Sequence, residues 1–471
     1  MERIDALAQR KGYTVGGLTI GQCIELAGEL DLKVSDVVIA EAMQVNKMTH
    51  EEVLSSVLAA FDHNLHAVEV GYTSGSSFIM GKVGQELNQQ AIVLNQDPFI
   101  NKVLHYTLAA QVGNHSVGLQ PCAGTGDSCP YAGIVKALLE TMENREQVAA
   151  LTALILKVGT IFRVGKVTTG CNLEGFGAGS AALAAAFTER LGGTPQQMER
   201  AMVLALSPTI AVPCTPRVMV AGLCAAHIGG AVVNAHLTAN LAVNTTLPVT
   251  VPIDVMIAMA TAVHPVSAKY VVPVVIQYME PFFKTNDAVD HYVTDEVKAK
   301  EHARIEETIA QASAEARSLA ARANSIVKPF GEAVVGGSSQ AVGSPTNTAR
   351  IAHSLAKGEI TGVKIELYPE LFARRGINVP GILMGAIYGA ATDNAQMYRE
   401  VMGKVLEAKL NVEIIEVDEP QLQRITIYAK EQNAVVEALN RGGGRLVIRA
   451  ASPSVEEARQ NARTLQIDVI D

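Results

Sequence analysis

The spacing of apolar residues changes along this chain, and the change constrains the fold more than any other feature. Up to about residue 293, apolar residues recur at helical spacing between glycine-rich turns, which predicts a close-packed helical core. Residues 294–326 are rich in Ala, Glu, Lys and Arg, with charged pairs three or four positions apart, as in an exposed helix. Short β-branched runs follow.

These patterns predict a multidomain fold of the α plus α/β class. We expect an all-helical domain over residues 1–293, a connecting helix and linker over 294–330, and a small α/β domain over 331–471. In the last domain, strands are predicted at 362–368, 412–417, 425–428 and 446–449. Helices are predicted at 396–408, 431–439 and 455–464. The glycine run 442–444 lacks the partners of a phosphate-binding loop and is predicted to be a turn.

Charge and composition limit the classes of partner that the chain is expected to bind. Its 38 basic and 47 acidic residues give a net charge of -9, which disfavours nucleic acid and anionic membranes. The apolar stretches 178–187 and 266–276 are interrupted before reaching the roughly 18 residues of a membrane span, so we expect buried helices there. The N-terminus shows no leader pattern, which predicts a cytoplasmic protein. Apolar helix surface with few aromatic residues predicts a homodimer.

Three cysteines carry the strongest chemical signal. Cys171, Cys214 and Cys224 each lie close to glycine or proline at an expected helix start. Three thiolates leave one iron of a [4Fe-4S] cluster without a protein ligand, and an open iron is a Lewis acid. Zinc with three cysteine ligands is the chemical alternative, because soft thiolates select either metal. The plain structural alternative is three buried thiols that act as small apolar side chains.

The segments that hold these cysteines resemble a known family. Residues 170–177, 191–197 and 214–224 are similar, in order and spacing, to the α-chain of iron-sulfur L-serine dehydratases, and the likeness extends over about residues 30 to 260. Residues 363–371 resemble a strand of that family's β-chain. Before that strand, residues 337–345 resemble a degraded Ser-Ser-Ser-His-Thr motif whose histidine is absent.

The resemblance implies a [4Fe-4S] cluster on Cys171, Cys214 and Cys224, and β-elimination of water from a small hydroxy amino acid. L-serine is the default substrate, and the products are a 2-oxo acid and ammonia. The missing motif histidine favours a second hypothesis, in which the enzyme is an L-cysteine desulfidase or acts on another β-substituted acid. A third hypothesis is an amino-acid sensor without catalysis, in which the α/β domain binds the ligand.

Two segments are candidates for binding a small-molecule amino acid. The loop containing Ser74, Gly75 and Ser76 offers backbone N–H groups and hydroxyls, which favour a carboxylate. The degraded motif implies further contacts from four polar residues, namely Ser338, Ser339, Thr346 and Asn347. A simple turn at the first segment and a polar linker at the second are the structural alternatives.

Acid and base candidates are taken from positions near the cysteines. His227 lies three residues after Cys224, and Glu174 lies three residues after Cys171. Lys166 is a candidate for holding the substrate carboxylate. The structural alternatives are a hydrogen-bonded core histidine for His227, shared by His236, a helix cap for Glu174 and a solvated lysine. Cys122 and Cys129 are predicted to line the cavity, with redox sensitivity or a fourth ligand as alternatives, whereas Cys23 is predicted to be core.

Overall fold

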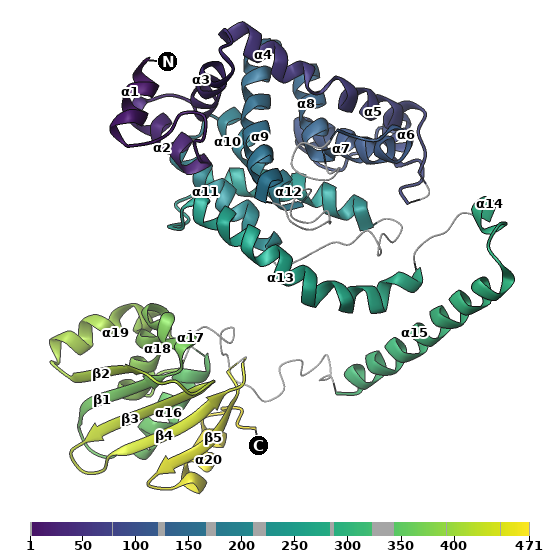
Figure 1. Ribbon diagram of the computed structural model, residues 1–471. Helices are drawn as coiled ribbons and strands as arrows, with labels where there is room; N and C mark the ends of the chain where they lie inside the picture. Colours follow the sequence, from purple (N-terminus) through teal and green to yellow (C-terminus); the bar gives the residue numbers. More distant parts are fainter. Residues whose placement is uncertain are drawn as a thin grey trace. The chain divides into compact units, whose positions relative to one another are not determined.

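The computed structural model describes residues 2–77, 79–120, 128–165, 176–210, 223–282, 287–322, 343–391, 393–442 and 444–470. The chain divides into two compact units, Met1–Ala314 and Glu315–Asp471. The first unit is helical throughout its described residues, and the second contains a five-stranded mixed sheet with helices (Figure 1). The predicted order of an all-helical part followed by a small α/β part is therefore confirmed.

The helices of the first unit are α1 (Glu2–Arg10), α2 (Ile20–Leu30), α3 (Val34–Asn46), α4 (His50–Ala59), α5 (Asp62–Thr73), α6 (Val83–Gln89), α7 (Pro98–Val117), α8 (Cys129–Thr141), α9 (Arg145–Gly165), α10 (Gly179–Arg190), α11 (Pro195–Leu206), η2 (Ser207–Thr209), α12 (Leu223–Asn244), α13 (Ile253–Met279), η4 (Glu280–Phe282) and α14 (Asp287–Asp290). The mostly exposed helix α15 (Asp295–Arg322) follows them. Local sequence sets many of the starts. Thr19, Thr49 and Thr194 each precede a helix with a capping box, in which the threonine hydroxyl and a glutamine amide or glutamate carboxylate oxygen accept from the first free N–H groups.

Helices α5 and α7 pack at backbone distance, and two glycines make this possible. A Cβ atom on Gly71 would lie 1.9 Å from the carbonyl oxygen of Ala109, and one on Gly113 would lie 1.9 Å from that of Ala67. Helix α8 comes close in the same way, because a Cβ atom on Gly133 would lie 2.2 Å from Thr107 Oγ1. This packing fixes the later half of α7 against the loop that follows α5.

Two helices of the described chain have the length and apolar composition to cross a membrane. Helix α9 is mostly inside the unit, since 61% of its most apolar window is buried, whereas the corresponding share in α13 is 22%. Residues 178–187 are buried in and just before α10, as predicted. The expectation of burial for residues 266–276 is wrong: the helix continues through Pro273, and no side chain after Ser267 is buried. The neighbouring helices cover only its first half.

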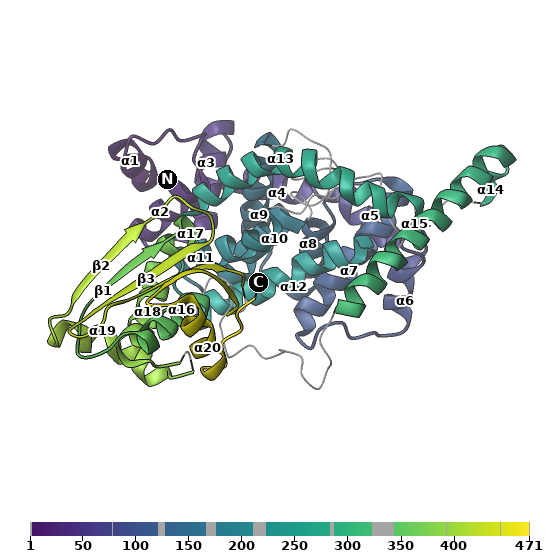
Figure 2. The same cartoon turned by 90° about the horizontal axis from the view of Figure 1, so that it is seen from below.

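The second unit folds around a sheet with the strand order β2-β1-β3-β4-β5. The strands are β1 (Ile360–Leu367), β2 (Asn411–Glu416), β3 (Leu422–Ala429), β4 (Ala434–Asn440) and β5 (Leu446–Ser452), and only the β1–β2 pair is parallel. The helices are α16 (Gly343–Leu355), α17 (Pro369–Ala373), α18 (Arg375–Tyr388), α19 (Ala395–Glu407) and α20 (Val455–Thr464). Helices α16, α18 and α20 cover one face of the sheet, where Ile365, Ile425 and Val436 are fully buried (Figures 1 and 2).

The prediction of a helix at residues 431–439 is wrong, because β4 occupies most of that stretch. Asn433 accepts a hydrogen bond from the N–H of Ala429 at 2.9 Å and closes a short turn after β3. In β4, Ala434, Val436 and Ala438 are buried at alternate positions, which is the spacing of a strand with one covered face. The glycine run 442–444 then lies between β4 and β5, with Gly442 and Gly444 at positive φ, as expected of a turn.

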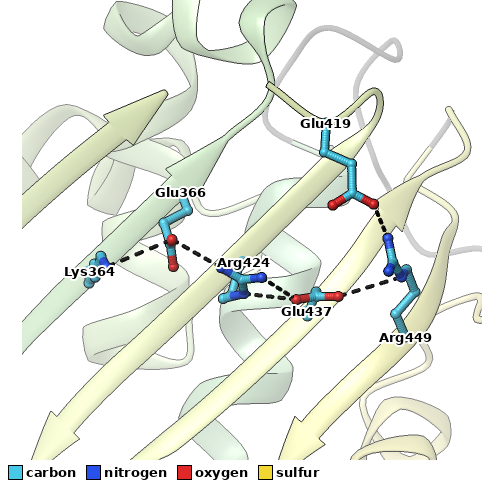
Figure 3. A network of polar contacts seen from close by, with 6 residues as sticks. All are labelled: Lys364, Glu366, Glu419, Arg424, Glu437 and Arg449. Atoms are coloured by element: carbon cyan, nitrogen blue, oxygen red, sulfur yellow. Dashed lines mark hydrogen bonds and ion pairs between the residues drawn. The ribbon is translucent and has the colours of Figure 1, made fainter. Parts of the chain in front are cut away.

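The other face of the sheet carries a network of six charged residues (Figure 3): Lys364, Glu366, Glu419, Arg424, Glu437 and Arg449. Arg424 donates to Glu366 at 3.0 Å and, through two nitrogens, to Glu437 at 2.8 and 2.5 Å. Arg449 pairs with Glu419 and lies 3.5 Å from Glu437. The hydrogen bond to Glu437 raises the pKa of Arg424. On this face, every arginine of the network has carboxylate partners.

The glycine contacts between α5 and α7 generate a prediction about stability. Gly113→Ala places a methyl group against the Ala67 carbonyl, so the free energy of unfolding should fall by about 1–3 kcal/mol, the usual range for overpacking. Gly229→Ala is the matched control, because its methyl group would meet only Leu104 Cδ2 at 3.8 Å. Urea unfolding followed by circular dichroism measures both. Equal stability of the two variants would contradict the close packing.

Candidate functional site

The predicted cluster ligands are only partly within the described residues. Cys171 and Cys214 lie outside them, as do Glu174 and Lys166. Cys224 is the second residue of α12 and is half-buried. A helix N-terminus favours the thiolate form of a cysteine, which is the form that binds metals. Within the described ranges, no three His, Cys, Asp or Glu side chains are grouped to hold a metal ion. The three-cysteine site therefore stays a prediction.

The chain that follows Cys171 returns to the first turns of α12. The ring of Phe176 lies 6.2 Å from that of His227, and a Cβ atom on Gly230 would lie 3.0 Å from the Phe176 ring. His227 is half-buried there. Phe176 is five residues from Cys171 in sequence, and Cys224 lies one helical turn before His227. Phe176 and Cys224 therefore lie toward the same end of α12.

A half-buried amide on α12 bonds to the helices that precede the third cysteine segment. Asn234 of α12 donates to Ser180 Oγ and to the carbonyl oxygen of Ala205, both at 2.7 Å. These bonds join the start of α10 and the end of α11 to α12. Residues 207–209 form the short helix η2 directly after α11, and the segment with Cys214 follows. The described residues that flank these cysteines therefore contact α12, Phe176 near its first turns and Ala205 further along it.

Helices α7 and α12 run antiparallel beside each other. Leu104 of α7 lies 3.8 Å from the position a Gly229 Cβ atom would take. Nearer the start of α7, Phe99 contacts the ring of Phe187, which also contacts His236 further along α12. The first turn of α12 therefore lies toward the later half of α7.

A chain of hydrogen bonds runs through this later half of α7. Ser77 Oγ lies 2.6 Å from Nδ1 of His115. The amide of Gln111 bridges His115 Nε2 at 3.0 Å and Cys129 Sγ at 2.8 Å. The Ser77 hydroxyl oxygen also accepts N–H groups from Ile79 and Met80, both at 3.2 Å.

Burial lowers the pKa of His115, so the imidazole is neutral near pH 7. Because Nε2 faces the NH2 group of Gln111, the proton of the neutral ring is on Nδ1 and points at Ser77 Oγ. A neutral histidine paired with a serine hydroxyl is a competent proton-transfer group.

The sequence prediction missed both residues. The available signals were the position of Ser77 next to the Ser74–Ser76 candidates and the four-residue spacing of Gln111 and His115 on one helix face.

The loop predicted to bind a carboxylate lies directly beside this chain of bonds. Ser74 and Ser76 are exposed, and Gly75 between them is buried. The N–H of Gly75 donates to the Val70 carbonyl at 2.6 Å, and the Gly75 carbonyl accepts from Gln85 Nε2 at 2.7 Å. The backbone of Gly75 therefore has internal partners, and a carboxylate at this loop would meet the two serine hydroxyls.

The remaining cysteines with described positions are both buried. Cys23 lies in the core, as predicted, and desolvation raises its pKa to about 12, which disfavours the thiolate that a metal needs. Cys129 is fully buried at the start of α8, where the hydrogen bond to Gln111 orients it. Cys122 lies outside the described residues.

In the second unit, Thr346 and Asn347 belong to the first turns of α16 and are buried. Asn347 Nδ2 donates to the Gly444 carbonyl at 3.0 Å. Ser338 and Ser339 lie outside the described residues.

These observations define a two-part protein, with a helical unit that contains Cys224 at the start of α12 and a small α/β unit. No family model matches the chain. Among curated proteins, it is 28% identical over 220 residues to the probable L-serine dehydratase, alpha chain, of Bacillus subtilis (strain 168). The matched part is 43% of this chain and 70% of that protein. This distant similarity supports the resemblance seen in the sequence at the level of the family.

The lowered pKa of His115 predicts a pH dependence of stability. Since the folded state holds the neutral ring, protonation favours unfolding, and the free energy of unfolding should fall as the pH drops below the ordinary pKa of 6.5. His115→Gln should make the pH dependence of the free energy of unfolding shallower between pH 6.5 and 5. Part of the pH dependence should remain in this variant, because burial also lowers the pKa of His105. His302→Gln on the exposed helix α15 is the control. Urea unfolding at several pH values measures it, and an unchanged slope in His115→Gln would oppose the assignment.

Proposed function

We propose that this protein is a lyase of the L-serine dehydratase type. It would remove water from a small hydroxy amino acid, with L-serine as the default, and release a 2-oxo acid and ammonia. The observation that carries the proposal is that Phe176, Ser180 and Ala205, which are described residues flanking Cys171 and Cys214 in sequence, contact α12, with Cys224 in its first turn. The similarity to an L-serine dehydratase alpha chain supports the same activity.

The proposed cofactor is a [4Fe-4S] cluster held by Cys171, Cys214 and Cys224. The described donor fits, because a half-buried cysteine at a helix N-terminus is readily deprotonated. When bound with three protein ligands, the cluster supplies an open iron that acts as a Lewis acid toward the leaving hydroxyl. Three-cysteine zinc remains the chemical alternative.

The protein residues would bind the substrate and move its proton. The exposed hydroxyls of Ser74 and Ser76 would orient the carboxylate. With the Gln111 amide turned so that its oxygen accepts from Nε2–H, neutral His115 would take the Ser77 proton at Nδ1 while Ser77 Oγ takes the Cα proton. His227, Glu174 and Lys166 remain the alternative acid, base and carboxylate-binding residues.

Cluster assembly is tested by cysteine replacement under anaerobic conditions. Alanine at Cys171, Cys214 or Cys224 should abolish both iron binding and the formation of pyruvate and ammonia from L-serine. Cys23→Ala is the matched control and should retain iron, because Cys23 is a core thiol. The measurements are iron and sulfide content, visible absorbance and turnover. An iron-free, inactive wild-type protein after reconstitution would end the proposal, and zinc with turnover would favour the alternative metal.

The proton-transfer role is tested separately. Ser77→Ala and His115→Gln should each lower kcat by about 10²- to 10⁴-fold, the range for general acid–base catalysis, while iron content is unchanged. His302→Gln provides a histidine control on the exposed helix α15. If both site variants kept wild-type kcat and pH profile, the base would have to be sought among the alternatives.

A second candidate substrate class follows from the missing histidine in residues 337–345. Without that side chain, elimination of sulfide from L-cysteine, or of another β-substituent, is favoured over dehydration. A panel of L-serine, L-cysteine and β-substituted acids under argon separates the two by kcat/KM. Ligand-dependent thermal stabilisation with no turnover on any member would instead favour an amino-acid sensor.

A further inference from the structure

The start of α8 packs against α7 in a register that places Cys129 opposite Gln111. A Cβ atom on Gly133 would lie 2.2 Å from Thr107 Oγ1. Four residues earlier on α8, the thiol of Cys129 donates at 2.8 Å to Oε1 of Gln111, which lies four residues later on α7. Cys129 is fully buried and Gln111 is buried. The packing of the two helices therefore fixes the contact between the thiol and the amide.

The backbone just before Cys129 is also tied to α5. Ser128 Oγ donates to the Gln120 carbonyl at 2.6 Å, and the same carbonyl accepts from Asn64 Nδ2 of α5 at 3.1 Å. The N–H of Gln120 donates to Asn64 Oδ1 at 2.7 Å. The thiol thus has a defined position relative to α5, and the loop that follows α5 carries Ser77.

The side-chain amide of Gln111 has an acceptor end and a donor end, and the two ends face different groups. Its oxygen accepts from the Cys129 thiol, and its NH2 group lies 3.0 Å from Nε2 of His115. Turning the amide over would place N–H groups against the sulfur, which is a weak acceptor. The thiol therefore stabilises the orientation in which the NH2 group faces the imidazole.

This orientation determines what the histidine can do. Which ring nitrogen carries the proton is set by the hydrogen bond that the other nitrogen makes. With the NH2 group at Nε2, the proton of His115 is on Nδ1 and points at Ser77 Oγ, 2.6 Å away. The Ser77 oxygen then accepts from three N–H groups, the other two being those of Ile79 and Met80. In this tautomer the hydroxyl can act toward a ligand only as a donor.

We propose that Cys129 and Gln111 are positioning residues that set the tautomer of His115, and that the thiol holds the Ser77–His115 pair in its proton-donating form until the amide turns. The turned amide accepts from Nε2–H and leaves Nδ1 unprotonated, as the base requires. For this change the ring takes one proton from water at Nε2 and releases one from Nδ1, so no net charge and no electron is transferred. Water can reach the ring because His115 is only half-buried.

The inference rests on the proposed function only for the catalytic meaning of the two tautomers. The tautomer itself is a property of the protein without substrate. It can therefore be measured whether or not the protein turns over an amino acid.

The tautomer is measured on the full chain by 15N–1H NMR with 15N-labelled histidine, above pH 7, where the ring is neutral. The His115 signal is assigned by its loss in His115→Gln, and the 15N shifts distinguish a protonated from an unprotonated ring nitrogen. Wild-type protein should carry the proton on Nδ1. Cys129→Ala should shift the tautomer ratio toward Nε2–H by about 3- to 10-fold, the effect of losing one neutral hydrogen bond.

Two further variants serve as controls for the thiol. Cys129→Ser keeps a donor to the amide oxygen and should keep the wild-type ratio. Cys23→Ala removes another fully buried thiol, from the core around α2, and should also keep it. In a Gln111→Leu background, Cys129→Ala should have no further effect, because the thiol acts through the amide.

The proposal is overturned if wild-type His115 carries its proton mainly on Nε2 or on both nitrogens, or if Cys129→Ala leaves the ratio unchanged. A ratio in Cys129→Ser that equals that of Cys129→Ala would also contradict it, as would a full effect of Cys129→Ala in the Gln111→Leu background. A merely structural thiol would change the Tm and leave the nitrogen shifts as they are. If Cys129→Ala does not fold, Gln111→Leu alone decides, since loss of the NH2 donor should shift the ratio toward Nε2–H.

The same variants distinguish this inference from the proposed activity. A tautomer that follows Cys129, in a protein that shows no turnover after reconstitution, would sink the lyase and keep the positioning role. Turnover that depends on Ser77, with one tautomer ratio in wild type and all Cys129 variants, would keep the lyase and sink the positioning role.

Discussion

The contact that the helical unit depends on is the backbone approach of α5 to α7 at Gly71 and Gly113. Side chains normally hold packed helices 8–10 Å apart, and glycine removes that spacer. Because α7 is held so close, the loop after α5 reaches His115, and the hydrogen bond between Ser77 and His115 forms across 38 residues of sequence. The candidate proton-transfer pair is therefore a product of helix packing.

The local sequence pattern predicted the structure correctly where the burial of a segment in the fold agrees with the spacing of its own apolar residues. The apolar run 178–187 is buried as predicted, and the strands at β1, β2, β3 and β5 begin within a few residues of their β-branched runs. The stretch 431–439 fits both a helix and a strand, and its neighbours β3 and β5 decided the outcome. Residues 266–276 are apolar enough for a core, yet α13 extends past the helices that cover its first half. Neither the strand at 431–439 nor the exposure of 266–276 can be predicted from the residues of the segment alone.

The residues of the candidate site also differ in whether local sequence could predict them. Cysteines beside glycine and proline carry their signal in a few adjacent residues, so Cys224 could be placed at a helix start from sequence. Ser77 and His115 have no such distinctive neighbours, because a serine in a polar loop and a histidine on a helix are both common. Only the register of α5 against α7 brings them to 2.6 Å. Residues that act together only through long-range contacts cannot be identified from the local pattern of a single sequence.

The second unit shows how charge balance differs between the two faces of the sheet. Arg424 and Arg449 lie on the outer face, where each carboxylate of the network is matched by an arginine or lysine and solvent screens what remains. Arg350 lies on the helix-covered side, where solvent screening is weaker, and none of the described carboxylates forms an ion pair with it. Burial without an ion pair costs stability that carboxylates and solvent offset for Arg424 and Arg449. Charge balance, more than exposure, therefore distinguishes the two environments.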